Sequence, residues 1–169
     1  MTPQHSSHSV PAGLYSPQQR ARRDASVWTL VQGVLAPLQF LVFLVSLVLV
    51  LRYLVSGDGY AAATLSVLVK TAALLLIMVT GAIWEKIVFG QYLFAPAFYW
   101  EDVMSFGVIA LHLAYVWALW AGALGPVSLM VLALAAYAAY VINAAQFLIK
   151  LRAARLQSAG ASVSGEVAA

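Results

Sequence analysis

Long apolar runs alternate with short polar breaks along this chain, and four of the runs are long enough to cross a bilayer. About 20 apolar residues, each rising about 1.5 Å in a helix, span roughly 30 Å of hydrocarbon. We place the membrane helices at residues 28–55, 62–89, 103–121 and 127–149. The breaks between them contain Gly, Pro, Ser and Asp, which tend to end helices. The pattern therefore predicts an all-α integral membrane protein folded as a four-helix bundle.

Composition excludes a soluble domain, because 63% of the residues are hydrophobic and only 9% are charged, with a mean hydropathy of +0.90. Soluble domains are about half apolar and about a quarter charged. The chain has no cysteine, which excludes disulfides, thiolate metal ligands and cysteine nucleophiles. Its net charge of +3 comes from short basic flanks, so we expect a lipid bilayer as partner and no nucleic acid.

Basic residues gather on one side of the predicted four-span topology. They are Arg20, Arg22, Arg23, Lys86, Lys150, Arg152 and Arg155, with Arg52 on the opposite side. Cytoplasmic loops carry the excess of Lys and Arg, so we expect a multi-pass protein with both termini in the cytoplasm. Residues 1–19 and 157–169 are rich in Ser, Gly, Ala and Pro, and we expect disordered tails there around a membrane domain at 20–156. His5 and His8 in the first tail are expected to be solvated.

The break between the second and third predicted helices carries acids and aromatic rings where a plain polar loop is usual. Residues 85–102 read EKIVFGQYLFAPAFYWED. Gly90 and Pro96 interrupt helicity, and the aromatic side chains favour the membrane interface. We therefore expect an aromatic interfacial or re-entrant segment between helices 2 and 3. Acids this close to hydrocarbon are costly to keep, which makes them candidate functional residues.

The other polar residues of the predicted helices gather in the same half of the bundle. Depths counted at about 1.5 Å per residue from the basic side place eight residues there: Gln32, Gln39, Glu85, Glu101, Asp102, His112, Asn143 and Gln146. Steps of four, three and four residues put Glu101, Ser105, Val108 and His112 on one helical stripe. We expect this stripe to face inward and line a polar pocket, whereas Lys70 lies in the opposite half without an assigned role.

Each of these residues has a structural alternative. Glu101 and Asp102 would complement a helix dipole as first-turn acids, and Glu85 beside Lys86 would fit an interfacial charge with a snorkelling neighbour. His112 and the four amides are also typical of hydrogen bonds between membrane helices. The aromatic rings alone would form an interface belt. The residues leave these alternatives open.

A flat metallated macrocycle would suit the combination of buried acids, aromatic rings and one imidazole. Burial favours the neutral form of a carboxyl group, which can then donate a proton. Aromatic walls suit a large flat apolar molecule, and a neutral imidazole near the membrane midplane suits an axial metal ligand. Electron transfer between two haems needs paired histidines inside the membrane, and His112 is the one histidine in the predicted spans.

Three stretches resemble the 3-vinyl bacteriochlorophyllide hydratase family of photosynthetic bacteria: RRDASVWTLVQGVLAPLQFLVFLVSLVLVLRYL, GAIWEKIVFGQYLFAPAFYWEDV and YVINAAQFLIKLRAARL. The likeness covers about residues 20–156. It implies addition of water across the C3-vinyl group of chlorophyllide a or 3-vinyl bacteriochlorophyllide a, which gives the 3-(1-hydroxyethyl) product in bacteriochlorophyll a biosynthesis. It also implies that the protein lies in a bacterial inner membrane, either cytoplasmic or intracytoplasmic. Contacts with neighbouring enzymes of the same pathway stay open.

With that substrate in view, we assign roles to the candidate residues as hypotheses. Glu101 donates a proton to the vinyl group, Glu85 orients or deprotonates water, and Asp102 is a third catalytic candidate. His112 is the axial ligand of the magnesium within the substrate, and no separate cofactor is expected because the reaction transfers no electrons. The remaining expected substrate-binding residues are Gln32, Gln39, Asn143, Gln146, Tyr99 and Trp100, with Lys86 or Lys150 pairing with the substrate propionate.

Two functions from other classes stay open. A non-catalytic membrane chlorin carrier or assembly factor would use the same aromatic walls and His112 without needing buried acids. A structural subunit of a larger membrane complex would use the polar residues only as contacts between helices. Two inward-facing acids, Glu85 and Glu101, favour the enzyme over both.

Overall fold

The computed structural model describes residues 14–167 and contains no strand in that part of the chain. A short helix, α1 (Pro17–Ala25), precedes four long helices: α2 (Val27–Ser56), α3 (Tyr60–Phe89), α4 (Tyr99–Trp120) and α5 (Pro126–Val167). Each long helix contains a stretch with the length and apolar composition to span a membrane. The predicted all-α class with four candidate membrane helices is confirmed.

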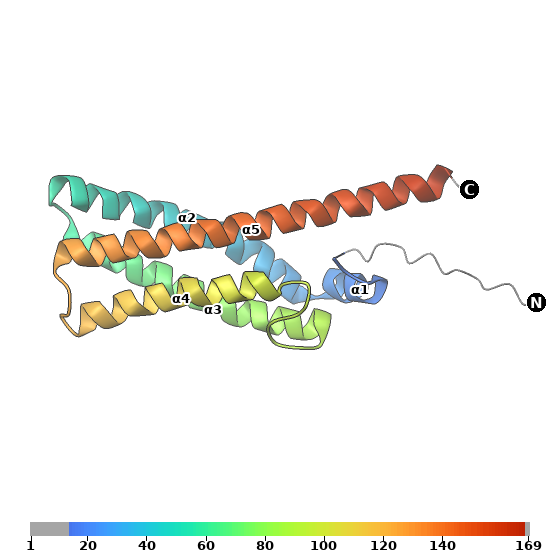
Figure 1. Ribbon diagram of the computed structural model, residues 1–169, viewed down its shortest axis with the longest axis horizontal. Coiled ribbons are helices and arrows are strands. Elements are labelled where there is room, and N and C mark those ends of the chain that lie inside the picture. Colours follow the sequence, from blue (N-terminus) through green and yellow to red (C-terminus); the bar gives the residue numbers. More distant parts are fainter. Residues whose placement is uncertain (1–13, 168–169) are drawn as a thin grey trace, which may run out of the picture.

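The long helices run side by side and alternate in direction (Figure 1). The α2–α3 and α4–α5 turns lie at one end of the bundle, which we call the far end. The α3–α4 connection lies at the opposite end together with α1, and α5 projects beyond the bundle there (Figure 1). We call this second end the terminal end.

Glycines in the left-handed conformation end α2 and α3. Gly57 (φ 77°) donates its backbone N–H to the carbonyl of Tyr53 at 2.8 Å, and Gly90 (φ 88°) donates to the carbonyl of Lys86 at 3.1 Å. Glycine adopts this conformation without the steric penalty that a Cβ imposes. The predicted breaks at both glycines are confirmed.

Two helices are longer than the spans predicted from the apolar runs. α4 begins at Tyr99 instead of residue 103, so Glu101 and Asp102 already lie in its first turn. α5 continues past residue 149 to Val167; residues 150–156 are all Ala, Leu, Lys and Arg, which favour helix. The division into tails at 1–19 and 157–169 and a membrane domain at 20–156 stays a prediction. His5, His8 and the rest of residues 1–13 lie outside the described residues, as do residues 168–169.

Helix α1 was not predicted, because it is polar and lacks an apolar run. Ser16 and Gln19 cap it reciprocally: the Ser16 backbone N–H donates to Gln19 Oε1 at 2.8 Å, and the Gln19 N–H donates to Ser16 Oγ at 3.2 Å. Pro17 occupies the first helical position, where its missing N–H is not needed. This serine-to-glutamine spacing is the sequence signal that could have located the helix.

Aromatic rings anchor α1 to the terminal end of the bundle. The buried ring of Tyr15 lies 5.8 Å from the ring centre of Phe89 and 6.3 Å from that of Phe98. The guanidinium of Arg23 lies over the other side of the same tyrosine, 4.7 Å from its centre. Burial raises the pKa of the Tyr15 hydroxyl, and the charge of Arg23 opposes that effect.

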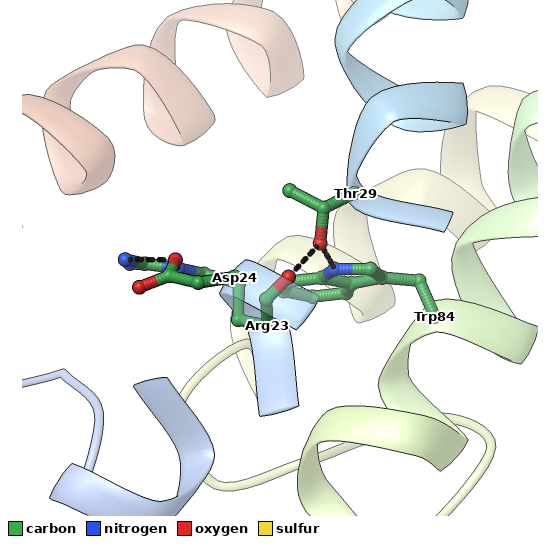
Figure 2. A network of polar contacts seen from close by, with 4 residues as sticks. All are labelled: Arg23, Asp24, Thr29 and Trp84. Atoms are coloured by element: carbon green, nitrogen blue, oxygen red, sulfur yellow. Dashed lines mark hydrogen bonds and ion pairs between the residues drawn. The ribbon is translucent and has the colours of Figure 1, made fainter. Parts of the chain in front are cut away.

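One threonine links α1, α2 and α3 (Figure 2). The hydroxyl of Thr29 donates to the backbone carbonyl of Arg23 at 2.6 Å and accepts from the indole N–H of Trp84 at 2.9 Å. The Arg23 side chain turns away from this contact and pairs with Asp24 at 2.7 Å. Because a single hydroxyl both donates and accepts, it fixes the start of α2 against α1 and α3 together.

The interior of the bundle mixes apolar and polar side chains. Its fully or nearly fully buried apolar residues include Val50, Val67, Val108, Tyr115, Met130 and Ala133. Large apolar side chains on all four long helices are exposed on the outside, which is expected of a surface that faces lipid tails. The buried polar side chains are therefore the distinctive feature of the interior.

Candidate active site

The predicted polar stripe of α4 faces the interior. Glu101, Ser105, Val108 and His112 are all buried, as their spacing predicted. Asp102 is buried too, although it lies beside the stripe. The buried polar residues separate into two groups, one at the terminal end and one further along α4 toward the far end.

Glu85 and Asp102 form a carboxyl pair at the terminal end, where α3 finishes and α4 starts. Their side chains are in hydrogen-bonding contact, and the two residues are only 5% and 4% exposed. An ionised carboxylate can accept but not donate a hydrogen bond, so the contact requires a proton held between them. Catalytic aspartate dyads hold one proton between two carboxyls in the same way.

The carboxyl pair also holds the loop between α3 and α4. Asp102 Oδ2 accepts the backbone N–H of Phe94 at 2.7 Å, and Glu85 Oε2 accepts that of Ala95 at 3.2 Å. Phe94 has a positive φ of 59°, which is uncommon for a residue with a bulky side chain. The loop conformation and the carboxyl pair therefore depend on each other.

Glu101 has a different partner. Its Oε2 lies 2.6 Å from Lys150 Nζ of α5, in an ion pair whose glutamate side chain is 9% exposed. The ammonium group also lies 5.1 Å from the ring centre of Phe98. One turn along α4, Ser105 Oγ accepts from Asn143 Nδ2 at 2.9 Å. The ion pair engages Glu101 with a cation, so the structure favours the carboxyl pair over Glu101 as the proton donor.

His112 presents a buried nitrogen without a protein partner. Its Nδ1 lies 2.8 Å from the carbonyl oxygen of Val108. Since a carbonyl only accepts, Nδ1 carries the hydrogen and Nε2 of the neutral ring carries the lone pair. Nε2 is buried and has no hydrogen-bond partner among the described residues. The fixed tautomer leaves this lone pair available to a metal ion.

Lys70 lies in the far half of the bundle, as predicted, and His112 lies in that half too instead of in the terminal half. Lys70 is fully buried, with Nζ 3.6 Å from the ring centre of Tyr140. It is close enough to His112 to act on it electrostatically, and the ring centre of Tyr137 lies 5.9 Å from that of His112. We call these four residues, Lys70, His112, Tyr137 and Tyr140, the central group.

The predicted amides occupy mixed positions. Gln32 donates to Thr80 Oγ1 at 2.8 Å, which is a contact between α2 and α3. Buried side-chain oxygens of Gln39, Asn143 and Gln146 have no hydrogen-bond partner among the described residues. Buried polar atoms are normally satisfied, so these oxygens are candidate contacts for a ligand or water.

The predicted aromatic wall faces outward in part. Tyr99 and Trp100 are 46% and 70% exposed and pack on each other at the surface, so the structure does not bring them to the buried acids. Lys86 is exposed and donates to the carbonyl of Gly90 at 2.8 Å. Phe98 is the ring of this segment that turns inward. The location of the segment in the membrane interface stays a prediction.

Two surface hollows lie away from these residues. One, of about 380 Å³, is lined by Tyr15 and by residues of α1, and the other, of about 450 Å³, is an apolar groove between α2 and α3. Neither hollow is lined by the carboxyl pair, by Glu101 or by the central group. The polar pocket stays a prediction.

The chain is similar in sequence to proteins of one family. A family model described as 2-vinyl bacteriochlorophyllide hydratase matches residues 15–153. The chain belongs to this family. A 2-vinyl bacteriochlorophyllide hydratase of Rhodobacter capsulatus is 70% identical over 146 residues, which cover 86% of this chain and 85% of the relative. One of Cereibacter sphaeroides is 73% identical over 144 residues, 85% of this chain and 89% of the relative. No solved structure matches.

The family match extends from the anchor of α1 to the last turns of the predicted membrane stretch of α5. It includes the carboxyl pair, the Glu101–Lys150 ion pair and the central group. The family description numbers the vinyl position 2, whereas the sequence analysis numbered it 3; the older and the systematic numbering of tetrapyrroles differ in this way for one and the same substituent. The resemblance stated from the sequence is confirmed.

Proposed function

We propose that this protein adds water across the vinyl group of a bacteriochlorophyllide-type tetrapyrrole, chlorophyllide a or 3-vinyl bacteriochlorophyllide a, and so acts as a hydro-lyase. The observation that carries the proposal is the buried contact between the Glu85 and Asp102 carboxyl groups, which is favourable when the two share one proton. The printed names of both relatives describe a hydratase of this type. A pigment carrier would have no use for a buried proton donor.

The reaction needs one proton donor and one proton acceptor. A proton is added to the terminal vinyl carbon, and the positive charge that forms on the inner carbon is spread over the conjugated macrocycle. Water attacks that inner carbon, and its second proton leaves to a base, which gives the 1-hydroxyethyl group. No electrons are gained or lost overall, so the balance requires no redox cofactor.

The geometry supports roles for the acids that differ from those first assigned. Glu85 and Asp102 share the proton that is donated, because their contact requires one. Glu101, paired with Lys150, accepts the proton from water. Both groups lie at the terminal end of α4, on adjacent residues, so a vinyl group placed between them meets donor and acceptor together.

The buried histidine supports a position for the rest of the macrocycle. His112 Nε2 carries a free lone pair in the bundle interior and would bind the magnesium of the substrate as its axial ligand. The unpartnered oxygens of Gln39, Asn143 and Gln146 would position water or accept from polar groups of the ring. Lys86, exposed at the terminal end, is a better partner for the propionate than Lys150, which is engaged with Glu101.

The membrane arrangement follows from charge. Arg20, Arg22 and Arg23 of α1 lie at the terminal end with Lys86 and Lys150, and an excess of basic residues marks the cytoplasmic side. We therefore place both termini in the cytoplasm and the protein in the bacterial inner membrane. The substrate propionate would then face the cytoplasm as well.

A direct assay tests the proposal. Membranes that carry this chain are incubated with chlorophyllide a in the dark without oxygen, beside membranes that lack it. Hydration removes the vinyl group from conjugation, which shifts the long-wavelength absorption band to shorter wavelength, and adds the mass of one water. Pigment that binds to folded protein and is recovered with its vinyl group intact would contradict the hydratase and favour the carrier.

A further inference from the structure

Lys70 is a fully buried amine for which the mechanism above has no use. It lies within the membrane stretch of α3, and its Nζ has no hydrogen-bond partner among the described residues. An ammonium or amine carries at least two N–H groups that water would otherwise satisfy. A buried donor left unsatisfied destabilises the fold, so the acceptor that Lys70 Nζ meets has to be identified.

The three buried acids, Glu85, Glu101 and Asp102, are too far away to serve. Lys70 and Glu85 are fifteen residues apart on α3, which is about 22 Å along the helix axis. Glu101 and Asp102 lie at the same terminal end as Glu85. The ring face of Tyr140 lies 3.6 Å from Nζ, which stabilises a positive charge but accepts no strong hydrogen bond. The amine therefore lacks an acceptor among the described residues.

The central group contains a second unpartnered nitrogen, His112 Nε2, and the two nitrogens together indicate the class of ligand that would carry the acceptor. His112 Nε2 has a lone pair that can bind a metal ion. Lys70, which is close enough to act on His112 electrostatically, can donate a hydrogen bond to an oxygen. A ligand that supplies both must carry a metal centre and an acceptor oxygen on one rigid frame. Tetrapyrroles of this class do, since their fifth ring bears a ketone and a methyl ester around the same macrocycle that holds magnesium.

We propose that Lys70 donates a hydrogen bond to a carbonyl oxygen on the fifth ring of the substrate while His112 binds the central magnesium. This inference rests on the proposed function and names the residue that fixes the rotation of the macrocycle about the magnesium axis. A ring held only by an axial ligand could turn and move its vinyl group away from the carboxyl pair. Lys70 is thus a positioning residue and does not touch the reacting carbons.

The test compares ligands as well as variants. Purified protein in detergent is titrated, by the shift of the pigment absorption band, with three magnesium chlorins: the parent, one whose fifth-ring ketone is reduced to methylene, and one that lacks the methyl ester. Lys70→Met keeps the length and apolar stem of the side chain but removes every donor. Arg52→Met, at an exposed position of α2 near the far end, controls for the loss of one positive charge.

Removing the contacted carbonyl from the ligand should weaken binding to the wild-type protein by about tenfold, the effect of one hydrogen bond. Lys70→Met should bind the parent about tenfold more weakly and should no longer distinguish it from the ligand that lacks that carbonyl. The ligand that lacks the other carbonyl group should still bind about tenfold more weakly to Lys70→Met than to the wild type. Arg52→Met should bind all three ligands as the wild type does. Loss of discrimination for the ketone or for the ester identifies which oxygen Lys70 contacts.

Equal affinity of Lys70→Met and wild type for the parent, or an equal loss for all three ligands, overturns the proposal. If the variant fails to fold, a measurement on the wild-type protein alone still tests the proposal. Resonance Raman spectra should show a lower carbonyl stretching frequency for the bound than for the free pigment, and unshifted carbonyl bands overturn the proposal too. All these readouts concern binding, so a protein that binds with this discrimination but forms no hydrated product refutes the proposed function and leaves the role of Lys70 standing.

Discussion

The carboxyl pair gives the sharpest prediction, because amide substitutions remove its proton while keeping its shape. In Glu85→Gln, the amide oxygen can still accept from the N–H of Ala95, and the amide N–H can donate to Asp102 where the shared proton was. In Asp102→Asn, the side chain can still accept from the N–H of Phe94, now 2.7 Å from Asp102 Oδ2. Both variants should therefore fold and keep the loop in place.

The expected loss is in the rate of hydration. Donation of a proton by a positioned acid contributes about 10²- to 10⁴-fold, which corresponds to about 3 to 5 kcal/mol of activation free energy. Either amide variant should lose a factor in this range. Asp102→Ala should in addition lose about 1 to 3 kcal/mol of unfolding free energy, because the N–H of Phe94 loses its acceptor and Glu85 loses its partner.

Initial rates of vinyl loss in membranes and unfolding curves in detergent give the two quantities separately. Asp58→Asn, an exposed acid at the far end, is the matched control and should leave both unchanged. Glu101→Gln discriminates the two assignments of the acid: it should retain more activity than Glu85→Gln if Glu101 only accepts a proton. Amide variants of the pair that hydrate at near wild-type rates would decide against the pair. A Glu101→Gln variant that is clearly more active than Glu85→Gln would decide for the pair as the acid.

Three further predictions concern the surroundings of the site. Lys150→Met should lower the unfolding free energy by about 1 to 3 kcal/mol, because a buried carboxylate loses its partner while the lysine is partly exposed, and Glu101→Gln in the same chain should restore most of it. Trp84→Phe should lower it by about 1 kcal/mol through loss of the bond to Thr29, with the hydration rate unchanged. Burial raises the pKa of Tyr15 above its ordinary 10.0. Folding thus favours the neutral phenol, so α1 should stay docked below about pH 10 and loosen as the pH rises through the pKa of the folded state, as measured by tryptic cleavage in α1; Tyr15→Phe should remove that pH dependence.

The apolar runs located the four long helices because burial in hydrocarbon demands a continuous apolar stretch. They missed α1 and the first turn of α4 for the same reason. Ser16, Gln19 and Pro17 carry a local capping signal that hydropathy ignores. Tyr99 starts α4 inside what hydropathy took for a loop, since two acids in a first turn lower the mean hydropathy while stabilising the helix end.

Spacing along one helix predicted which side chains face inward, but not which partners they meet. Glu101 was chosen as the acid because it shares a stripe with His112, and its pairing with Lys150 of α5 depends on how two helices pack. Asp102 points toward α3, where it meets Glu85. A signal for this pair was present: the two acids flank a short loop, and the backbone N–H groups of such a loop need acceptors close to hydrocarbon.

The depth of His112 could have been found by counting from the far end as well. Lys70 is ten residues from the start of α3 at Tyr60, and His112 is eight residues from the end of α4 at Trp120. At about 1.5 Å per residue these are depths of about 15 and 12 Å from the same side. Counting from the basic side placed Lys70 correctly but assigned His112 to the terminal half, although the two residues lie at similar depth.

The distance between the two polar groups limits the ligands that can use both. Asp102 and His112 are ten residues apart on one helix, about 15 Å along its axis. A small molecule bound at the carboxyl pair would leave the free nitrogens of Lys70 and His112 without a partner, and a metal ion alone at His112 would leave the shared proton unused. A rigid macrocycle with a central metal, a carbonyl on one edge and a reactive vinyl group on another carries a chemical partner for each of these groups. Its vinyl group lies closer to the metal than Asp102 lies to His112, so the helices must shift as the macrocycle binds. Variants that cross-link α4 to α5 should therefore slow pigment binding more than they slow hydration of pigment already bound.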